Sequence, residues 1–166
     1  YESSNNTISG NKITYNKEVG IDLTFSSSNS ISKNTITNKK YGILFFESYN
    51  NSVFENSITN NNYGIYCQFS SNNTIYHNDF IGNKKYQASI LRSTNTWDNG
   101  TEGNYWSDYT GKDQDSDGIG DTPYMITRII TPDYENQDNY PLMSRLGPPP
   151  PPFWTQLWFW TIIVVG

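Results

Sequence analysis

Cysteine, histidine and methionine are nearly missing from this sequence of 166 residues, which has one, one and two of them. Cys67 is the single cysteine, so no disulfide can form within the chain. Leu, Ile, Val and Phe are also few, and Asn, Ser and Thr replace them. Such a composition alone is typical of disordered chains. An aromatic content of 16% argues for a folded chain instead, because Tyr and Trp bury large areas.

Positive charge is scarce as well, and the net charge of -5 is unevenly distributed. Residues 1–97 hold eight Lys and Arg against six Asp and Glu, whereas residues 98–138 hold ten acidic residues against Lys112 and Arg128. The linear sequence has no basic stripe of the kind that binds nucleic acid, so we expect no nucleic-acid partner. The acidic segment indicates a cation instead.

A repeat with a period of 22 residues runs through the first half of the chain, in segments 3–23, 25–45, 47–67 and 69–90. Each segment has one apolar residue after Asn-Thr or Asn-Ser, another five residues later, and a final alternating pair. Alternation over so few residues predicts short strands. The apolar columns are Ile8/Ile31/Val53/Ile75, Ile13/Ile36/Ile58/Phe80, Ile21/Ile43/Ile65/Ala88 and Leu23/Phe45/Cys67/Ile90.

These columns predict an all-β fold, a right-handed parallel β-helix of about four 22-residue coils over residues 1–92. A leucine-rich repeat would need a Leu-rich consensus that is absent, and a four-stranded propeller blade has nearly twice this period. One coil cannot be stable without its neighbours. We therefore expect further coils before residue 1 in a longer protein.

Asparagine forms two more columns, Asn6/Asn29/Asn51/Asn73 and Asn11/Asn34/Asn56/Asn78. Asparagine tolerates the left-handed backbone of turns, and its amide can bond to the same residue of the next coil. We therefore predict turns braced by amide ladders. Gly20, Gly42 and Gly64 predict another turn, and Gln87 interrupts this column where the solenoid is expected to end.

After the last repeat, residues 93–146 are predicted to form an irregular cap over the open end of the β-helix. An uncovered row of strand edges invites aggregation. Trp97, Tyr105, Trp106 and Tyr109 are suited to cover it, because each ring is apolar and each carries a polar group that Asn and Asp of the same segment can bind. The alternative is that these aromatic residues form a sugar-binding platform.

The cap contains an acidic loop whose spacing matches a calcium-binding loop. Asp113, Asp115 and Asp117 place carboxylates at loop positions 1, 3 and 5. Gly118 occupies position 6, Ile119 offers its backbone carbonyl at position 7, and Asp121 is the acid at position 9. Position 12, usually Glu, is Tyr124, so Asp108, Asp133, Glu135 or Asp138 would have to complete the site. We expect a structural Ca²⁺; the alternative is a solvated acidic turn.

The end of the sequence predicts a membrane anchor. Residues 147–152 are a proline-rich linker, and residues 153–166 are strongly apolar with three Trp at their start. Fourteen residues are too few to span a bilayer, so we interpret them as the beginning of a transmembrane helix. The alternatives are an interfacial helix or a docking peptide.

This orientation places the β-helix on the extracellular surface. Glycosylation sequons agree with an exported chain and occur at Asn5, Asn50, Asn72 and Asn99, although an Asn-rich sequence produces some by chance.

The repeats, the segment GNYWSDYTGKDQDSDGIGDTPY at 103–124 and the closing DNYPLM at 138–143 resemble the NosD-type β-helix family, also called the carbohydrate-binding and sugar-hydrolase type. The resemblance covers residues 3–143 and is greatest to membrane-anchored surface proteins of archaea. It implies copper delivery to nitrous-oxide reductase. Copper needs His, Cys and Met ligands, and the chain offers His77, Cys67, Met125 and Met143. Cys67 falls in a buried column and His77 in a turn column that indicates the surface, so we assign copper to none of the four.

Three functions remain open from the sequence. The leading hypothesis is a non-catalytic cell-surface module for adhesion, envelope structure or glycan binding, in which Tyr41, Tyr63 and Tyr66 stack on sugars or simply form a solvated face. The second is a polysaccharide lyase or hydrolase with its active site in coils outside this sequence, since no two acidic residues of these coils share a column. The third is the NosD-like accessory role. The expected partners are an envelope polysaccharide and the membrane.

Overall fold

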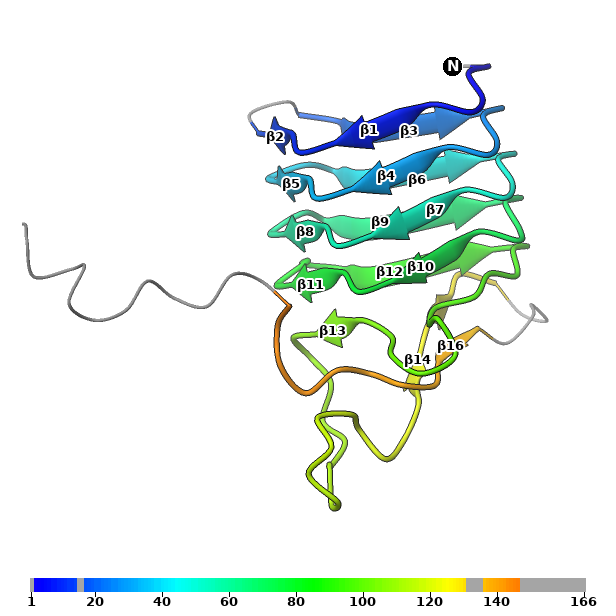
Figure 1. Ribbon diagram of the computed structural model, residues 1–166. Coiled ribbons are helices and arrows are strands. Elements are labelled where there is room, and N and C mark those ends of the chain that lie inside the picture. Colours follow the sequence, from blue (N-terminus) through cyan, green and yellow to red (C-terminus); the bar gives the residue numbers. More distant parts are fainter. Residues whose placement is uncertain (1, 15–16, 131–135, 147–166) are drawn as a thin grey trace, which may run out of the picture.

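The computed structural model describes residues 2–14, 17–130 and 136–146, and within these ranges the chain forms strands and turns but no helix. Figure 1 shows four coils stacked in sequence order, with an irregular cap below the last coil. Each coil has two short strands and one longer strand. This arrangement confirms the predicted parallel β-helix.

Three parallel sheets run along the stack, and each takes one strand from every coil. The first sheet contains β1 (Thr7–Ser9), β4 (Ser30–Ser32), β7 (Ser52–Phe54) and β10 (Thr74–Tyr76). The second contains β2 (Lys12–Ile13), β5 (Thr35–Thr37), β8 (Ser57–Thr59), β11 (Asp79–Ile81) and β13 (Tyr105–Trp106). The third contains β3 (Val19–Thr24), β6 (Tyr41–Phe46), β9 (Tyr63–Gln68), β12 (Tyr86–Leu91) and β15 (Thr127–Arg128).

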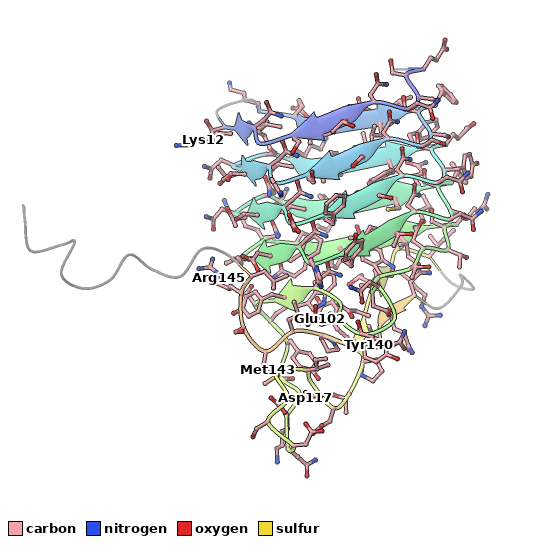
Figure 2. The ribbon with its side chains drawn as sticks, in the orientation of Figure 1. Lys12, Glu102, Asp117, Tyr140, Met143 and Arg145 are labelled. Carbon is pink, nitrogen blue, oxygen red and sulfur yellow. The ribbon has the colours of Figure 1, made fainter. Side chains whose placement is uncertain are left out.

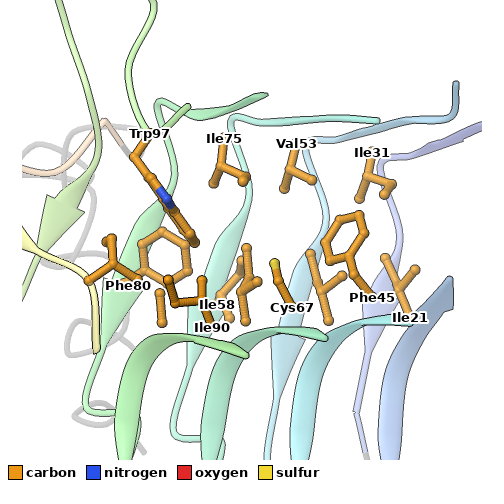
Figure 3. Packing of buried hydrophobic residues seen from close by; sticks show 14 of the residues in the cluster. Ile21, Ile31, Phe45, Val53, Ile58, Cys67, Ile75, Phe80, Ile90 and Trp97 are labelled. Atoms are coloured by element: carbon orange, nitrogen blue, oxygen red, sulfur yellow. The ribbon is translucent and has the colours of Figure 1, made fainter. Parts of the chain in front are cut away.

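The predicted apolar columns are confirmed as internal ladders. Ile21 pairs with Ile43, Ile43 with Ile65, and Ile65 with Ala88 in register along the third sheet. Figure 3 shows such side chains lying inside the stack, and Ile43, Ile65 and Phe80 have no exposed surface. Equivalent residues of neighbouring coils therefore cover one another, which gives a chain poor in aliphatic residues a continuous dry interior.

Both predicted asparagine ladders are present. The Oδ1 of Asn56 accepts hydrogen bonds from the backbone N–H and the Nδ2 of Asn34, each at 3.0 Å. The Nδ2 of Asn56 in turn donates to Asn78 Oδ1 and to two backbone carbonyls. A third ladder through Asn61 and Asn83, and a serine ladder, were not predicted. The serine ladder consists of Ser26, Ser48, Ser70 and Ser93.

The reason proposed for the asparagine columns was wrong in one respect. The left-handed backbone belongs to the residue before each ladder asparagine: Lys33 before Asn34 has φ 57°, and His77 before Asn78 has φ 55°. The left-handed residue turns the chain at a corner, and the next side chain then points inward. Positive φ therefore occurs at residues such as Asn50 and Asn72, as expected for asparagine, but also at lysine, glutamate and histidine, whose residue type does not predict it.

The glycine column also has another cause than the predicted turn. Gly42 and Gly64 lie inside β6 and β9 and have no positive φ. A Cβ on Gly42 would come within 2.5 Å of the carbonyl oxygen of Gly64. Glycine is therefore required here because neighbouring backbones approach too closely for any side chain. Gln87 ends the third ladder, since its Oε1 accepts a hydrogen bond of 2.7 Å from Asn83 Nδ2.

The cap covers the last coil with aromatic rings. Trp106 pairs with Phe80 in register and stacks on it at 4.4 Å between ring centroids, and Tyr124 stacks on the other face of Trp106 at 4.2 Å. Trp97 and Trp106 are buried as the sequence predicts, whereas Tyr105 is half-buried. The antiparallel pair of β14 (Tyr124–Met125) and β16 (Gln137–Asp138) closes the cap.

Candidate functional site

A ladder of four tyrosines lies on the outer face of the third sheet, and we call it the tyrosine ladder: Tyr41, Tyr63, Tyr66 and Tyr86. Tyr41 and Tyr63 begin successive strands of the sheet and stack at 4.9 Å with an interplanar angle of 27°. Tyr66 stacks on Tyr41 at 5.6 Å. All four are half-buried. Because the ring faces contact one another, the ladder presents ring edges and hydroxyl groups to solvent.

Two lysines flank the tyrosine ladder. The Lys85 ammonium lies 5.1 Å from the centre of the Tyr63 ring and donates a 2.7 Å hydrogen bond to its hydroxyl. This hydrogen bond is the main cause of the raised pKa of Lys85. The Lys40 ammonium lies 5.4 Å from the Tyr41 ring centre. The ladder therefore carries positive charge together with hydroxyl groups.

The acidic loop forms a compact group at the tip of the cap. Carboxylate oxygens of Asp113, Asp115 and Asp117 lie within 4.8 Å of one another. Asp113 accepts backbone hydrogen bonds from Asp117 and Gly118, which curls the loop around these carboxylates. Figure 2 shows Asp117 at the end of the molecule away from the coils. The arrangement gives converging hard oxygen ligands, which suit Ca²⁺.

The other residues of the loop have separate contacts. Asp121 is not part of the carboxylate group, and its Oδ2 accepts the Gln114 N–H at 3.0 Å. Ile119 forms a β-bridge with Leu142, which ties the loop to the closing segment. Position 118 has φ 91°, so its glycine is required by the turn.

Of the four residues suggested to complete the loop, the two that the structure describes, Asp108 and Asp138, have partners elsewhere in the cap. Asp108 accepts the hydroxyl hydrogen bond of Tyr124, at 3.2 Å. Asp138 is fully buried under the cap and accepts hydrogen bonds from Trp106 Nε1 and the Asn104 N–H. Burial raises the pKa of Asp138 to about 6. Asp133 and Glu135 lie outside the described residues.

A groove of about 340 Å³ lies on the corner between the first and second sheets. It is lined by Glu55 and Asp79, which come from different columns, and by Lys33 and His77. The repeat columns do not predict a groove with two acids, because Glu55 and Asp79 stand two columns apart in successive coils. Glu55 pairs with Lys33 at 3.6 Å, and Asp79 accepts the N–H of Leu146.

The residues available for copper do not form a site. Cys67 lies inside the stack (Figure 3) with no exposed surface, and burial raises the pKa of its thiol. His77 lies on an outer corner, with Nε2 2.7 Å from Glu102 Oε2. Met125 and Met143 are exposed on the cap. Within the described ranges the one group of three His, Cys, Asp or Glu ligands is the acidic loop, and its carboxylates are hard oxygen ligands that do not fit copper.

The predicted glycosylation sites are all exposed. Asn5, Asn50 and Asn72 occupy one corner, each with positive φ and each followed by a ladder asparagine and a strand hydroxyl residue. The fold itself therefore accounts for three of the four sequons. Asn99 instead lies in a turn of the cap, where its Oδ1 accepts hydrogen bonds from the backbone N–H groups of Thr101 and Glu102. Glycosylation stays a prediction.

The linker at 147–152 and the anchor at 153–166 lie outside the described residues. In the part of the chain that the structure does describe, no helix is long and apolar enough to cross a membrane.

Comparisons with known proteins point to one family. The sequence profile described as Periplasmic copper-binding protein (NosD) matches residues 1–111, ending before the acidic loop. The Probable ABC transporter binding protein NosD of Pseudomonas aeruginosa is 44% identical over 45 residues, which are 27% of this chain and 10% of that protein. The protein of the same name from Stutzerimonas stutzeri is 42% identical over 45 residues, with the same shares. The matched stretch therefore spans about a tenth of each relative.

Proposed function

Because this chain belongs to the NosD family of periplasmic copper-binding proteins, we propose that it is a non-catalytic β-helix module, exposed outside the cytoplasm, that binds a glycan along the tyrosine ladder. The observation that carries the proposal is the unbroken contact of four tyrosines across three coils on one face. A periodic row of hydroxyl groups matches a ligand that is itself periodic. A polysaccharide is such a ligand.

The ladder geometry specifies how the glycan is held. Tyr41 and Tyr63 cover one another's ring faces, so sugar rings have few free faces to stack on. Phenol hydroxyls and the side-chain amides of nearby corner residues such as Asn60 and Asn62 supply donors and acceptors for sugar hydroxyls. Binding therefore depends on hydrogen bonds to ring edges rather than on stacking.

The non-catalytic part of the proposal is supported by the groove at the first corner. Glycoside hydrolysis needs one carboxyl group that donates a proton and one free carboxylate. Glu55 is held by Lys33, and Asp79 is buried with its Oδ1 bonded to the Leu146 backbone. Neither carboxyl group is therefore free to act as the proton donor or as the free carboxylate of a glycosidase.

A second candidate is the NosD-like accessory role in copper delivery to nitrous-oxide reductase, which the family match favours. The dispersed positions of Cys67, His77 and Met143 argue against a copper site in this chain. Titration with Cu(I) discriminates the two. Tight binding that is lost in His77→Ala would favour the accessory role.

The acidic loop is proposed to bind a structural Ca²⁺. Support comes from the three converging carboxylates and from the link between Ile119 and Leu142, which connects the loop to the cap. The bound ion would offset repulsion among the aspartates and fix the loop on the cap.

The glycan proposal is tested with the full chain on an array of neutral and acidic polysaccharides. The variant Tyr41→Phe/Tyr63→Phe/Tyr66→Phe keeps the stacked rings but removes the hydroxyls, so we expect its affinity to fall about tenfold. Tyr49→Phe, outside the ladder, should bind like the wild type. Unchanged affinity of the triple variant, or no retained glycan at all, would refute the proposal.

A further inference from the structure

The corner between the second and third sheets carries a concentration of lysine that the linear sequence hides. Each coil contributes its corner residues to a hollow of about 330 Å³, lined by four lysines and three asparagines. The lysines are Lys17, Lys39, Lys40 and Lys84, which are up to 67 positions apart in sequence. The period of the coils brings them together.

The charge of this corner is opposite to that of the whole chain. With Lys85, which follows Lys84, five of the eight lysines lie here, while the chain has a net charge of -5. Glu18 offsets part of this charge through an ion pair of 3.6 Å with Lys40. The remaining excess is positive, and clustered charges of one sign raise the local concentration of an opposite ligand.

The lysine corner is continuous with the tyrosine ladder. Lys40 and Lys85 belong to the corner, and their ammonium groups lie over the Tyr41 and Tyr63 rings. A ligand that follows the ladder from coil to coil must therefore pass the lysines as well.

We propose that the lysine corner and the tyrosine ladder form one site for an acidic glycan, a polysaccharide that carries carboxylate or sulfate groups. The anionic groups pair with Lys40, Lys84 and Lys85, while the sugar hydroxyls bond to the tyrosine edges and to the Asn60 and Asn62 amides. This inference rests on the proposed glycan binding and specifies the class of glycan.

A nucleic acid fits the same surface less well. Single strands are bound by stacking bases on open aromatic faces. The faces of Tyr41, Tyr63 and Tyr66 are largely taken up by one another. Hydroxyl edges, amides and ammonium groups match the hydroxyls and acid groups of a glycan instead.

The experiment measures the affinity of the full chain for two matched pairs of probes, polygalacturonate with its methyl ester and dextran sulfate with dextran. We expect at least one acidic probe to bind at least tenfold more tightly than its neutral partner, with the difference shrinking as salt screens the charges. Lys40→Gln/Lys84→Gln/Lys85→Gln should weaken acidic binding by about tenfold. Lys12→Gln/Lys33→Gln/Lys112→Gln, with the same loss of charge elsewhere, should retain it.

The outcomes separate this inference from the proposal beneath it. Equal binding of acidic and neutral partners, with no effect of the lysine variant, overturns the acidic preference and leaves glycan binding standing. Binding of no probe overturns both. A single-stranded DNA oligonucleotide bound as tightly as the acidic glycan overturns the preference for sugar.

Discussion

At the scale of single residues, each coil follows one rule at its corners. A left-handed residue turns the chain, and the next residue sends a polar side chain inward to bond with its equivalents above and below. Lys33 and Asn34 are one such pair, and Phe25 and Ser26 are another. The inward residue is serine or asparagine at these corners, with the exception of the buried Lys39 after Asn38, because a small polar side chain can satisfy its hydrogen bonds inside the stack. The left-handed residue faces solvent and varies freely in type.

Ile43→Asp tests the interior at this scale. Ile43 is fully buried between Ile21 and Ile65, so a carboxylate there would lose its hydration without gaining a partner. We expect a loss of more than about 4 kcal/mol of the free energy of unfolding, enough to abolish cooperative melting followed by circular dichroism.

Leu44→Asp is the matched control, because Leu44 is the next residue in β6 and faces outward beside Asp22. It should melt within a few degrees of the wild type. Native-like spectra and melting for Ile43→Asp would contradict the internal ladder.

At the scale of elements, the cap is held by aromatic stacking and one buried carboxylate. Asp138 in β16 accepts hydrogen bonds from Trp106 Nε1 and from the Asn104 and Tyr140 N–H groups. It thereby joins the closing strand to the rings over the last coil. The Asn78 ladder continues to Asn104, so the coil and the cap share one hydrogen-bond network.

Asp138 should make stability depend on pH in a defined window. Burial raises its pKa to about 6, so the folded chain holds the proton more tightly than the unfolded chain does. Its contribution therefore favours the folded state at low pH and is lost as pH rises from about 4 to about 6, by up to about 3 kcal/mol. Urea unfolding of wild type and Asp138→Asn at several pH values measures this. If the free energies of unfolding of the wild type and of Asp138→Asn change in parallel between about pH 4 and about pH 6, Asp138 is not the group responsible.

Calcium should stabilise the cap if the acidic loop binds it. An ion at about one hundred times its dissociation constant adds about 2.7 kcal/mol, so EDTA should lower the Tm by several degrees. The effect should vanish in Asp113→Asn/Asp117→Asn and persist in Asp108→Asn, whose carboxylate contacts Tyr124 instead. A Tm that is indifferent to both calcium and EDTA would exclude a structural ion.

At the scale of the whole molecule, the stack behaves as one repeating unit. Every coil uses the same register with its neighbours, so stability is the sum of coil terms and coil–coil interfaces. Deletion of residues 47–68 joins Phe46 to Phe69, which occupies the same left-handed corner as Glu47. The shortened chain should keep its β-sheet spectrum and cooperative melting at a lower Tm.

Deletion of residues 47–67 is the control for register. It removes one residue fewer, so Gln68 stays as an extra residue at this corner and must bulge outward for the following strands to keep their register. This variant should melt at a lower Tm than the deletion of residues 47–68. Equal Tm values for the two deletions would contradict the 22-residue register between neighbouring coils.

The sequence by itself determined the solenoid and its interior. A fixed period places Ile21, Ile43 and Ile65 above one another, because stacked parallel strands repeat every coil, and the asparagine ladders follow from the same period. The spacing of the acidic loop was also readable, since a turn of a few residues brings Asp113, Asp115 and Asp117 together wherever it lies.

Only the tertiary structure decided where the cap residues and the surface charges meet. Asp138 lies beneath Trp106, 32 residues away, and no local spacing predicts that distance. The lysine corner arises because Lys17, Lys39, Lys40 and Lys84 occupy the same corner of different coils, and the one-residue slips near Glu18 and Lys84 hide this common position in the sequence. The period of the repeat specifies which residues of neighbouring coils stack on one another. The irregular segments of the cap are placed by packing between residues far apart in the sequence, which the local sequence does not encode.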